Sequence, residues 1–147
     1  MFFPKSILVP TDFSEYSDQS LQIAIDIAKQ FKSKIYFFHV VGIVSQYMPY
    51  YGFDPKMVSQ LGDESLTAAK KMLTEQLTKF PDSKSVEVVT EVRIGAPYQE
   101  ILRNQEEKKV DLIVIASQGR TGLLNHLIGS VAERVVRNAN CQVLLVK

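Results

Sequence analysis

Five short runs of hydrophobic residues are spaced along the chain, and each is rich in the β-branched, leucine or aromatic side chains that occur in buried strands. The runs are SILVP from Ser6, KIYFFHVV from Lys34, VEVVTEV from Val86, VDLIVIA from Val110 and QVLLVK from Gln142. The intervals between them are long enough to form helices. We therefore expect five strands separated by helices.

The first two intervals carry hydrophobic residues three and four positions apart, which places them on one face of a helix. They are Leu21, Ala24, Ile25, Ala28 and Phe31 in the first interval, and Leu66, Ala69, Leu73, Leu77 and Phe80 in the second. A third helix is expected to carry Pro97 in its first turn and to end near the charged run at residues 106–109. A fourth is expected after Gly129, with Val131, Val135 and Val136 facing inward.

This alternation is typical of an α/β protein in which a five-stranded parallel sheet carries helices on both faces. With 147 residues, a single domain over residues 1–147 is expected. The third strand alternates hydrophobic with charged residues, so we expect it at a partly solvated edge. In such sheets ligands bind beyond the carboxyl ends of the strands, here in the loops after the first and fourth strands.

The composition argues against several classes of function. Seventeen Lys and Arg residues against sixteen Asp and Glu residues give a formal net charge of +1, so nothing favours nucleic acid or an anionic membrane as a partner. No segment reaches the roughly 18 apolar residues of a membrane span. Cys141 is the only cysteine, which excludes an intramolecular disulfide and fits a cytoplasmic protein. His39 and His126 belong to no spaced cluster of metal ligands, so no metal site is expected.

Asp12 follows the first strand, at the mouth of the expected crevice. Two interpretations remain open for it. Because Glu15 follows three residues later, Asp12 fits a capping box at the start of the first helix. Alternatively, its carboxylate accepts a hydrogen bond from a ribose hydroxyl or a base amine, or belongs to the shell of a metal.

The segment ASQGRTGLLNHLIGSVAERVV, residues 116–136, is the stronger candidate for a ligand site. Gly119 and Gly122 permit a positive φ, Gly129 lets the chain approach a ligand closely, and Ser130 with the following amides opens a helix. That arrangement suits phosphate. In the alternative interpretation the first two glycines only form a turn and Ser130 only caps the helix. The segment is neither a Walker loop nor a GxGxxG loop.

Five segments together form a specific signature that covers almost the whole chain. They are ILVPTDFSEYSDQSLQIAIDIAKQF near the start, IYFFHVV in the second strand, GAPYQEIL from Gly95, DLIVIASQGRTGL from Asp111 and GSVAERVVRNANCQVLLV near the end. With these segments the chain resembles the universal stress protein A family. Nucleotide-binding members of that family carry Gly, two residues, Gly, nine residues, and then Gly with Ser or Thr. Here Gly119, Gly129 and Ser130 match that pattern, and Ala116 stands in the place of the first glycine.

The resemblance implies a Rossmann-like fold of the adenine nucleotide alpha hydrolase-like type, with strand order 3-2-1-4-5. It also implies that ATP, alone or with Mg²⁺, binds in the crevice between strands one and four. Near the adenosine the matching residues are Pro10, Thr11 and Asp12, with the backbone of Val40 at the adenine edge. The matching residues along the ribose and phosphates are Ala116, Ser117, Gly119, Arg120, Gly129, Ser130 and Val131.

The function best suited to these residues is that of a cytoplasmic regulatory protein in stress tolerance, whose bound ATP acts on a partner through shape or stability. The enzymatic alternative is a slow ATP hydrolase, but Arg120 and Asp12 are its only visible catalytic candidates and no dedicated base is present. A nucleotide-free dimeric interaction module is the third alternative. A phosphoacceptor receiver domain fits poorly, because the third strand runs into Arg93, Ile94 and Gly95 instead of an Asp.

The fifth strand, Gln142 to Val146, has no charge, proline or glycine, yet the implied strand order puts it at a sheet edge. An uncovered edge of this kind favours pairing with another strand, and members of the family commonly dimerise there. We therefore expect a homodimer joined through this strand.

The connection from Val41 to Lys56 is unusually long and carries three tyrosines. Its composition is compatible with a lid over the site and equally with a surface loop packed on its own aromatic residues.

Overall fold

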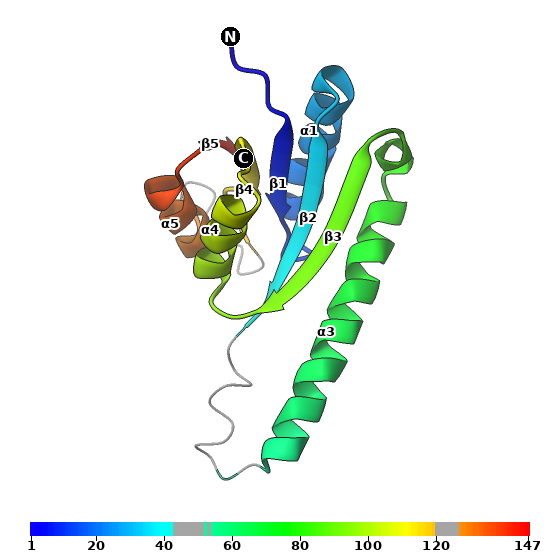
Figure 1. The fold of residues 1–147 in the computed structure, drawn as a ribbon, viewed down its shortest axis with the longest axis vertical. Helices are drawn as coiled ribbons and strands as arrows, with labels where there is room; N and C mark the ends of the chain where they lie inside the picture. The colour runs from blue at the N-terminus through cyan, green and yellow to red at the C-terminus, as the bar shows by residue number, and fades with distance from the viewer. Residues whose placement is uncertain (43–51, 53, 120–126) are drawn as a thin grey trace.

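The computed structural model describes residues 1–42, 52, 54–119 and 127–147. Strands and helices alternate along the chain as the hydrophobic pattern predicts. The strands form one parallel sheet in the order β3-β2-β1-β4-β5 (Figure 1). The predicted fold class and strand order are confirmed.

The strands are short, and the central one is the most buried. They are β1 (Ser6–Pro10), β2 (Lys34–Val41), β3 (Glu87–Ile94), β4 (Leu112–Ala116) and β5 (Gln142–Val146). β1 pairs with β2 on one side and with β4 on the other. Its residues Ile7, Leu8 and Val9 are fully buried. A strand that is hydrophobic on both faces is what a sheet between two helix layers requires.

The helices begin and end at residues suited to those positions. They are α1 (Glu15–Phe31), α3 (Pro55–Thr78), α4 (Pro97–Glu107) and α5 (Ser130–Asn138), with a short 3-10 helix η2 (Pro81–Ser85) after α3. The side chain of Ser14 caps α1 by accepting a hydrogen bond from the amide of Ser17, and Asp54 caps α3 through the amide of Lys56. α1 ends at Lys32, which adopts the left-handed conformation common at helix ends, with φ 56°.

Successive residues of the central strands contribute to two hydrophobic cores, one on each face of the sheet. On one face, α1 and α3 pack over a core that includes Ile7 and Val9. On the other face, α4 and α5 pack over a core that includes Leu8 and Ile113. β1 and β4 pair in parallel. The loops that follow these two strands therefore leave the sheet at the same end, the carboxyl end.

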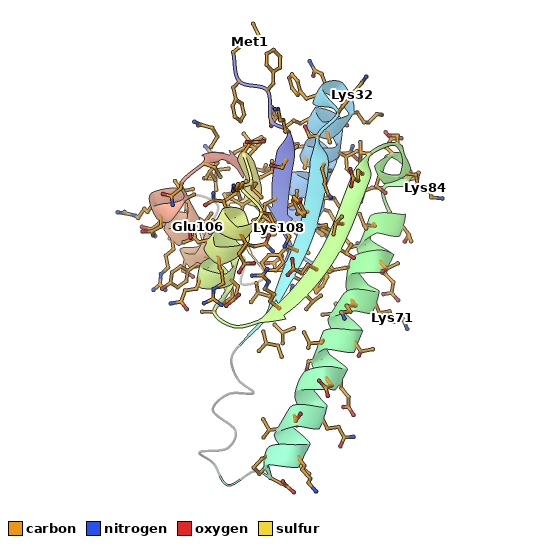
Figure 2. The ribbon with its side chains drawn as sticks, viewed as in Figure 1. Met1, Lys32, Lys71, Lys84, Glu106 and Lys108 are labelled. Atoms are coloured by element: carbon orange, nitrogen blue, oxygen red, sulfur yellow. The ribbon has the colours of Figure 1, made fainter. Side chains whose placement is uncertain are left out.

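Helix α3 is the longest helix, and mainly its second half packs on the sheet. Figure 1 shows its first half extending past the carboxyl ends of β2 and β3. Figure 2 shows Lys71 pointing away from the sheet, in agreement with the 78% exposure of its side chain. The buried residues of α3 are Gly62, Ala69, Leu73 and Gln76. One polar side chain, that of Gln76, therefore belongs to the packed face of this helix.

The inward position expected for Val136 is wrong. Val136 is 45% exposed, whereas Ala132 and Val135 are the buried residues of α5. The helix has only nine residues and buries a narrow stripe, so the residue after Val135 already faces solvent. Of the long connection after β2, residues 43–51 and 53 lie outside the described residues. Among the helices described, none is long and apolar enough to cross a membrane.

Candidate functional site

A cavity of about 290 Å³ lies at the carboxyl ends of β1 and β4. Ten of the residues implied by the resemblance line it: Pro10, Thr11, Asp12, Val40, Ala116, Ser117, Gly119, Gly129, Ser130 and Val131. The remaining one, Arg120, lies outside the described residues. The fold thus gathers around one cavity residues that are more than a hundred positions apart in the sequence.

Asp12 occupies a tight turn between β1 and α1. Its Oδ1 accepts hydrogen bonds from the amide of Ser14, at 3.0 Å, and from the hydroxyl of Ser14. The N-cap of α1 is Ser14, because the helix starts at Glu15. The capping-box interpretation of Asp12 is therefore wrong. One oxygen of the Asp12 carboxylate closes the turn, and the other, Oδ2, faces Gly119 in the loop after β4.

Gly119 is a glycine for a reason other than a positive φ. Gly52 is the glycine with a positive φ among the described residues, so the conformational freedom that glycine permits at position 119 is not used. The space that a side chain at position 119 would need is taken by the carboxylate of Asp12. The glycine therefore permits close contact between the two loops. Gly122, the other glycine that would permit a positive φ, lies outside the described residues.

The start of α5 borders the same cavity. Gly129 is its N-cap, and the amide of Gly129 donates a hydrogen bond to the carbonyl oxygen of Ser117. No side chain caps this helix among the described residues, and Ser130 is its exposed first residue, so the interpretation of Ser130 as a cap is wrong. The first amides of a helix have no acceptor within the helix and carry partial positive charge. Their place beside the cavity suits an anionic group such as phosphate.

Ala116 is the last residue of β4 and pairs with Val146 of β5. The described non-glycine residues with a positive φ are Phe13, Lys32 and Lys109, so Ala116 has a conformation open to any L-residue. Alanine in place of the family's first glycine therefore imposes no backbone strain here.

Several further residues line the cavity, and the sequence interpretation did not assign them to the site. They are Ser17, Phe38, His39, Pro97, Ile101, Ile115, Gln118 and Ala132. Phe38, Ile101 and Ile115 are buried and supply apolar walls. Apolar walls with a few convergent polar groups are typical of small-molecule sites. Topology alone could have predicted that the start of α4 belongs to the site. A helix that follows a parallel strand begins at the carboxyl end of the sheet, where ligands bind.

His39 forms a hydrogen bond with the turn that carries Asp12. Its Nδ1 lies 2.7 Å from the carbonyl oxygen of Thr11, and because a carbonyl only accepts, Nδ1 is the donor. The ring of His39 also packs on the ring of Phe13, with centroids 4.3 Å apart. These contacts give His39 a part in shaping the turn. His126, the other histidine considered above, lies outside the described residues.

Comparisons with known proteins agree with this fold. The universal stress protein family model matches residues 4–147. Universal stress protein MJ0531 of Methanocaldococcus jannaschii is 38% identical over 143 residues, which span 97% of this chain and 82% of that protein. The solved structure of MJ0577 from the same organism is similar with a TM-score of 0.84 and 27% identity, over 99% of this chain and 97% of that one. A universal stress protein from Archaeoglobus fulgidus, solved in complex with dAMP, shares the fold at 20% identity and a TM-score of 0.57, over 99% of this chain and 98% of that one.

Proposed function

Because the chain belongs to the universal stress protein family, we propose that it binds ATP in the cavity between β1 and β4 and acts as a nucleotide-responsive regulatory protein. One observation carries the proposal. A single cavity brings together a carboxylate, apolar walls and the open start of a helix, and each of these suits a different part of ATP.

The adenosine would lie at the end formed by β1 and β2. There Val40, a partly exposed lining residue, offers apolar surface of the kind that contacts a purine ring, and its backbone would meet the adenine edge. Asp12 is the carboxylate on this side of the cavity, and its oxygens can accept a hydrogen bond from a ribose hydroxyl.

The phosphates would lie at the start of α5. Gly129 has φ −61° and ψ 152°, which any residue can adopt, and a Cβ there would meet the nearest atom of the described residues, Ser117 O, at an ordinary 3.4 Å. Neither the backbone nor the described packing therefore requires glycine at this position. A closely approaching ligand would account for it. Any Mg²⁺ would be held chiefly by the phosphates, because no group of three or more acidic, His or Cys side chains suited to a metal occurs in the described part of the chain.

The dAMP complex of the Archaeoglobus protein supports the same class of ligand, since that protein has this fold and holds an adenine nucleotide. Whether this chain prefers a mono- or a triphosphate depends on the phosphate end of its own site. ATP is the form that we propose, on the match of Gly119, Gly129 and Ser130 to the family's nucleotide motif.

The proposal is tested by identifying the small molecules that the purified protein carries and by measuring what it binds. Mass spectrometry of the denatured protein should release an adenine nucleotide. Isothermal titration of the emptied protein should show binding of ATP, ADP and AMP at one site per chain. Recovering no nucleotide and measuring no binding at millimolar ATP would overturn the proposal and favour a nucleotide-free interaction module.

We also propose a homodimer joined through β5. This strand is at the edge of the sheet and pairs on its inner side with β4. Val143 and Leu145 pack into the core under α4 and α5, whereas Leu144 on the other face is 38% exposed. Antiparallel pairing with the same strand of a second copy would complete the sheet and cover Leu144.

A further inference from the structure

Gln76 of α3 is a buried polar residue that reaches from a helix on the outside of the sheet to the cavity. Its side chain is 4% exposed, and its Oε1 accepts a 2.8 Å hydrogen bond from the hydroxyl of Thr11, a cavity residue. Its Nε2 donates to Asp18 Oδ1 at 2.7 Å and to Ser17 Oγ at 3.3 Å. The amide is thus bonded at both ends.

The orientation of this amide is determined by its partners. The Asp18 carboxylate only accepts, so the NH₂ group of Gln76 must face it, and the amide oxygen must then face Thr11. An amide oxygen cannot donate, so the proton between the pair comes from Thr11. Ser17 Oγ lies 2.9 Å from Thr11 Oγ1, and because the hydroxyl of Ser17 donates to the carbonyl oxygen of Ser14 at 2.7 Å, Ser17 is a second acceptor for the Thr11 proton. Gln76, at 2.8 Å, and Ser17 therefore together direct the Thr11 hydroxyl away from the turn.

A fixed Thr11 hydroxyl in turn holds the backbone of the site. With its proton directed to Gln76 and Ser17, Thr11 Oγ1 presents its lone pairs to the amide of Phe13, which donates to it at 3.0 Å. Phe13 has φ 66°, a conformation that is costly for a bulky residue and that persists only when its surroundings hold it. Asp12 lies between these two residues. Its position in the cavity consequently depends on a turn that Gln76 stabilises from behind.

The packing does not otherwise require a polar residue at position 76. The other buried positions of α3 are Gly62, Ala69 and Leu73, and the helix packs on the core that contains Leu73. A buried amide is unfavourable unless it is fully hydrogen-bonded, so an apolar residue would serve packing alone at least as well.

We infer that Gln76 is a positioning residue for the adenosine end of the nucleotide site, acting through Thr11 on the turn that carries Asp12. The inference rests on the proposed nucleotide binding, and it concerns a residue that contacts the lining residues Thr11 and Ser17 but does not itself line the cavity. It requires that loss of the Gln76 amide weakens the binding of every adenine nucleotide by the same factor, because the phosphate end of the site at α5 is unchanged.

The test compares Gln76→Met with Gln105→Met. Methionine has nearly the shape of glutamine without its polar group. Gln105 is the matched control because it is equally buried, at 6%, but belongs to α4 and bonds with Asn140, away from the cavity. Titration with ATP and with AMP, at a temperature well below unfolding, is combined with urea unfolding of each variant.

Gln76→Met should bind ATP and AMP about five- to tenfold more weakly and by equal factors, whereas Gln105→Met should lose stability without losing affinity. In a Thr11→Val background, Gln76→Met should cost no further affinity. Unchanged affinity in Gln76→Met, or an equal loss in Gln105→Met, would overturn the inference.

If Gln76→Met does not fold, Asp18→Ala removes the carboxylate that orients the amide and should reduce affinity as well. Parental affinity in that variant would be an equally clear refutation. Absence of ATP and AMP binding by the parent protein would instead count against the proposed function itself, and is recognised before any variant is made.

Discussion

A Cβ on residue 119 would lie 2.9 Å from Oδ2 of Asp12, so glycine at this position and the carboxylate on the opposite loop fit each other. Asp12 cannot move aside freely, because its Oδ1 is held by the amide of Ser14 at 3.0 Å. Gly119→Ala should therefore displace the carboxylate and weaken ATP binding by about 1 kcal/mol, or roughly fivefold. Isothermal titration measures the loss.

A double-mutant cycle identifies the cause of that loss. If the added methyl acts through Asp12, Gly119→Ala should have little effect on affinity in an Asp12→Ala background. Gly42→Ala is a control for adding a methyl to a glycine, since a Cβ there would have no atom of the described residues within 4 Å. An equal loss in both backgrounds would mean that the methyl contacts the ligand itself.

Gly129→Val should weaken ATP binding more strongly, by about 2 kcal/mol or more, because branched carbons at the start of α5 would exclude the phosphates from the amides. The free energy of unfolding should change less than the binding free energy. Titration calorimetry and urea unfolding of the same variant give the two values.

Gly129→Ala provides the graded comparison for the valine variant. The protein itself accommodates a Cβ at ordinary contact distance from Ser117 O, so the alanine variant should fold like the parent. Its affinity should lie between those of the parent and Gly129→Val. A folded Gly129→Val protein with parental ATP affinity would leave this segment as a turn and a helix start, without a role in holding phosphate.

Ala116→Gly restores the first glycine of the family's nucleotide motif. Because Ala116 has no positive φ and ends β4 in regular pairing with Val146, its methyl causes no strain that glycine would relieve. We expect ATP affinity to change by less than about twofold, with a stability loss of about 0.5–1 kcal/mol for a glycine at the end of a strand. A marked gain in affinity would show that the methyl obstructs the nucleotide.

The hydrophobic pattern alone was enough to place the strands and helices, because a sheet between two helix layers needs apolar runs such as ILV in β1 and LIVI in β4. The order of the strands came from the family resemblance. The described residues that the resemblance implies for the site, from Pro10 to Val131, line one cavity, and their role in binding stays a prediction.

The hydrophobic pattern could not predict interactions between side chains that are far apart in the sequence. The periodicity of α3 identifies its apolar residues but gives no sign of Gln76. The inferred role of Gln76 depends on its hydrogen bond with Thr11, which is 65 positions away in the sequence. A glycine such as Gly119 can be needed either for a positive φ or because a neighbouring atom leaves no room for a side chain. The sequence does not distinguish these reasons, whereas the position of the Asp12 carboxylate in the structure does. The capping choice between Asp12 and Ser14 likewise depends on where the helix starts, and sequence fixes such boundaries only within a few residues.

Leu144→Lys should abolish the proposed dimer. Leu144 is the middle residue of β5, so antiparallel pairing of two copies would bring the lysines of both chains close together at the new interface. Sedimentation analysis should then show monomer or aggregate in place of dimer. Lys71→Glu on the exposed side of α3 is the control for a change of surface charge and should leave the assembly unchanged. A Leu144→Lys dimer as stable as that of the parent would place the interface elsewhere.

The last prediction concerns Glu91 of β3, which ties the edge of the sheet to α4. Its Oε1 bonds with Arg93 Nε at 2.6 Å, and its Oε2 accepts hydrogen bonds from Asn104 and from Lys108, which Figure 2 labels near the end of α4. Partial burial acts to raise the pKa of Glu91, but the hydrogen bonds from Lys108 and Arg93 outweigh it and hold the pKa below its ordinary value.

A carboxylate whose pKa is lowered by folding stabilises the folded state above its unfolded pKa, and this contribution is lost as the pH falls through the folded value. Glu91→Gln should therefore cost about 1 kcal/mol of unfolding free energy at pH 7, a modest figure because the group is partly solvated. The difference from the parent should persist down to about pH 5 and shrink below about pH 4, where the parent's carboxyl also becomes protonated. Urea unfolding at a series of pH values measures it. Glu87→Gln on the same strand removes an exposed pair with Lys34 and should cost much less than Glu91→Gln, because a solvated surface ion pair contributes little. If the Glu91→Gln difference is the same at pH 3 as at pH 7, its cause is packing and the charge of Glu91 does not hold α4 to the sheet.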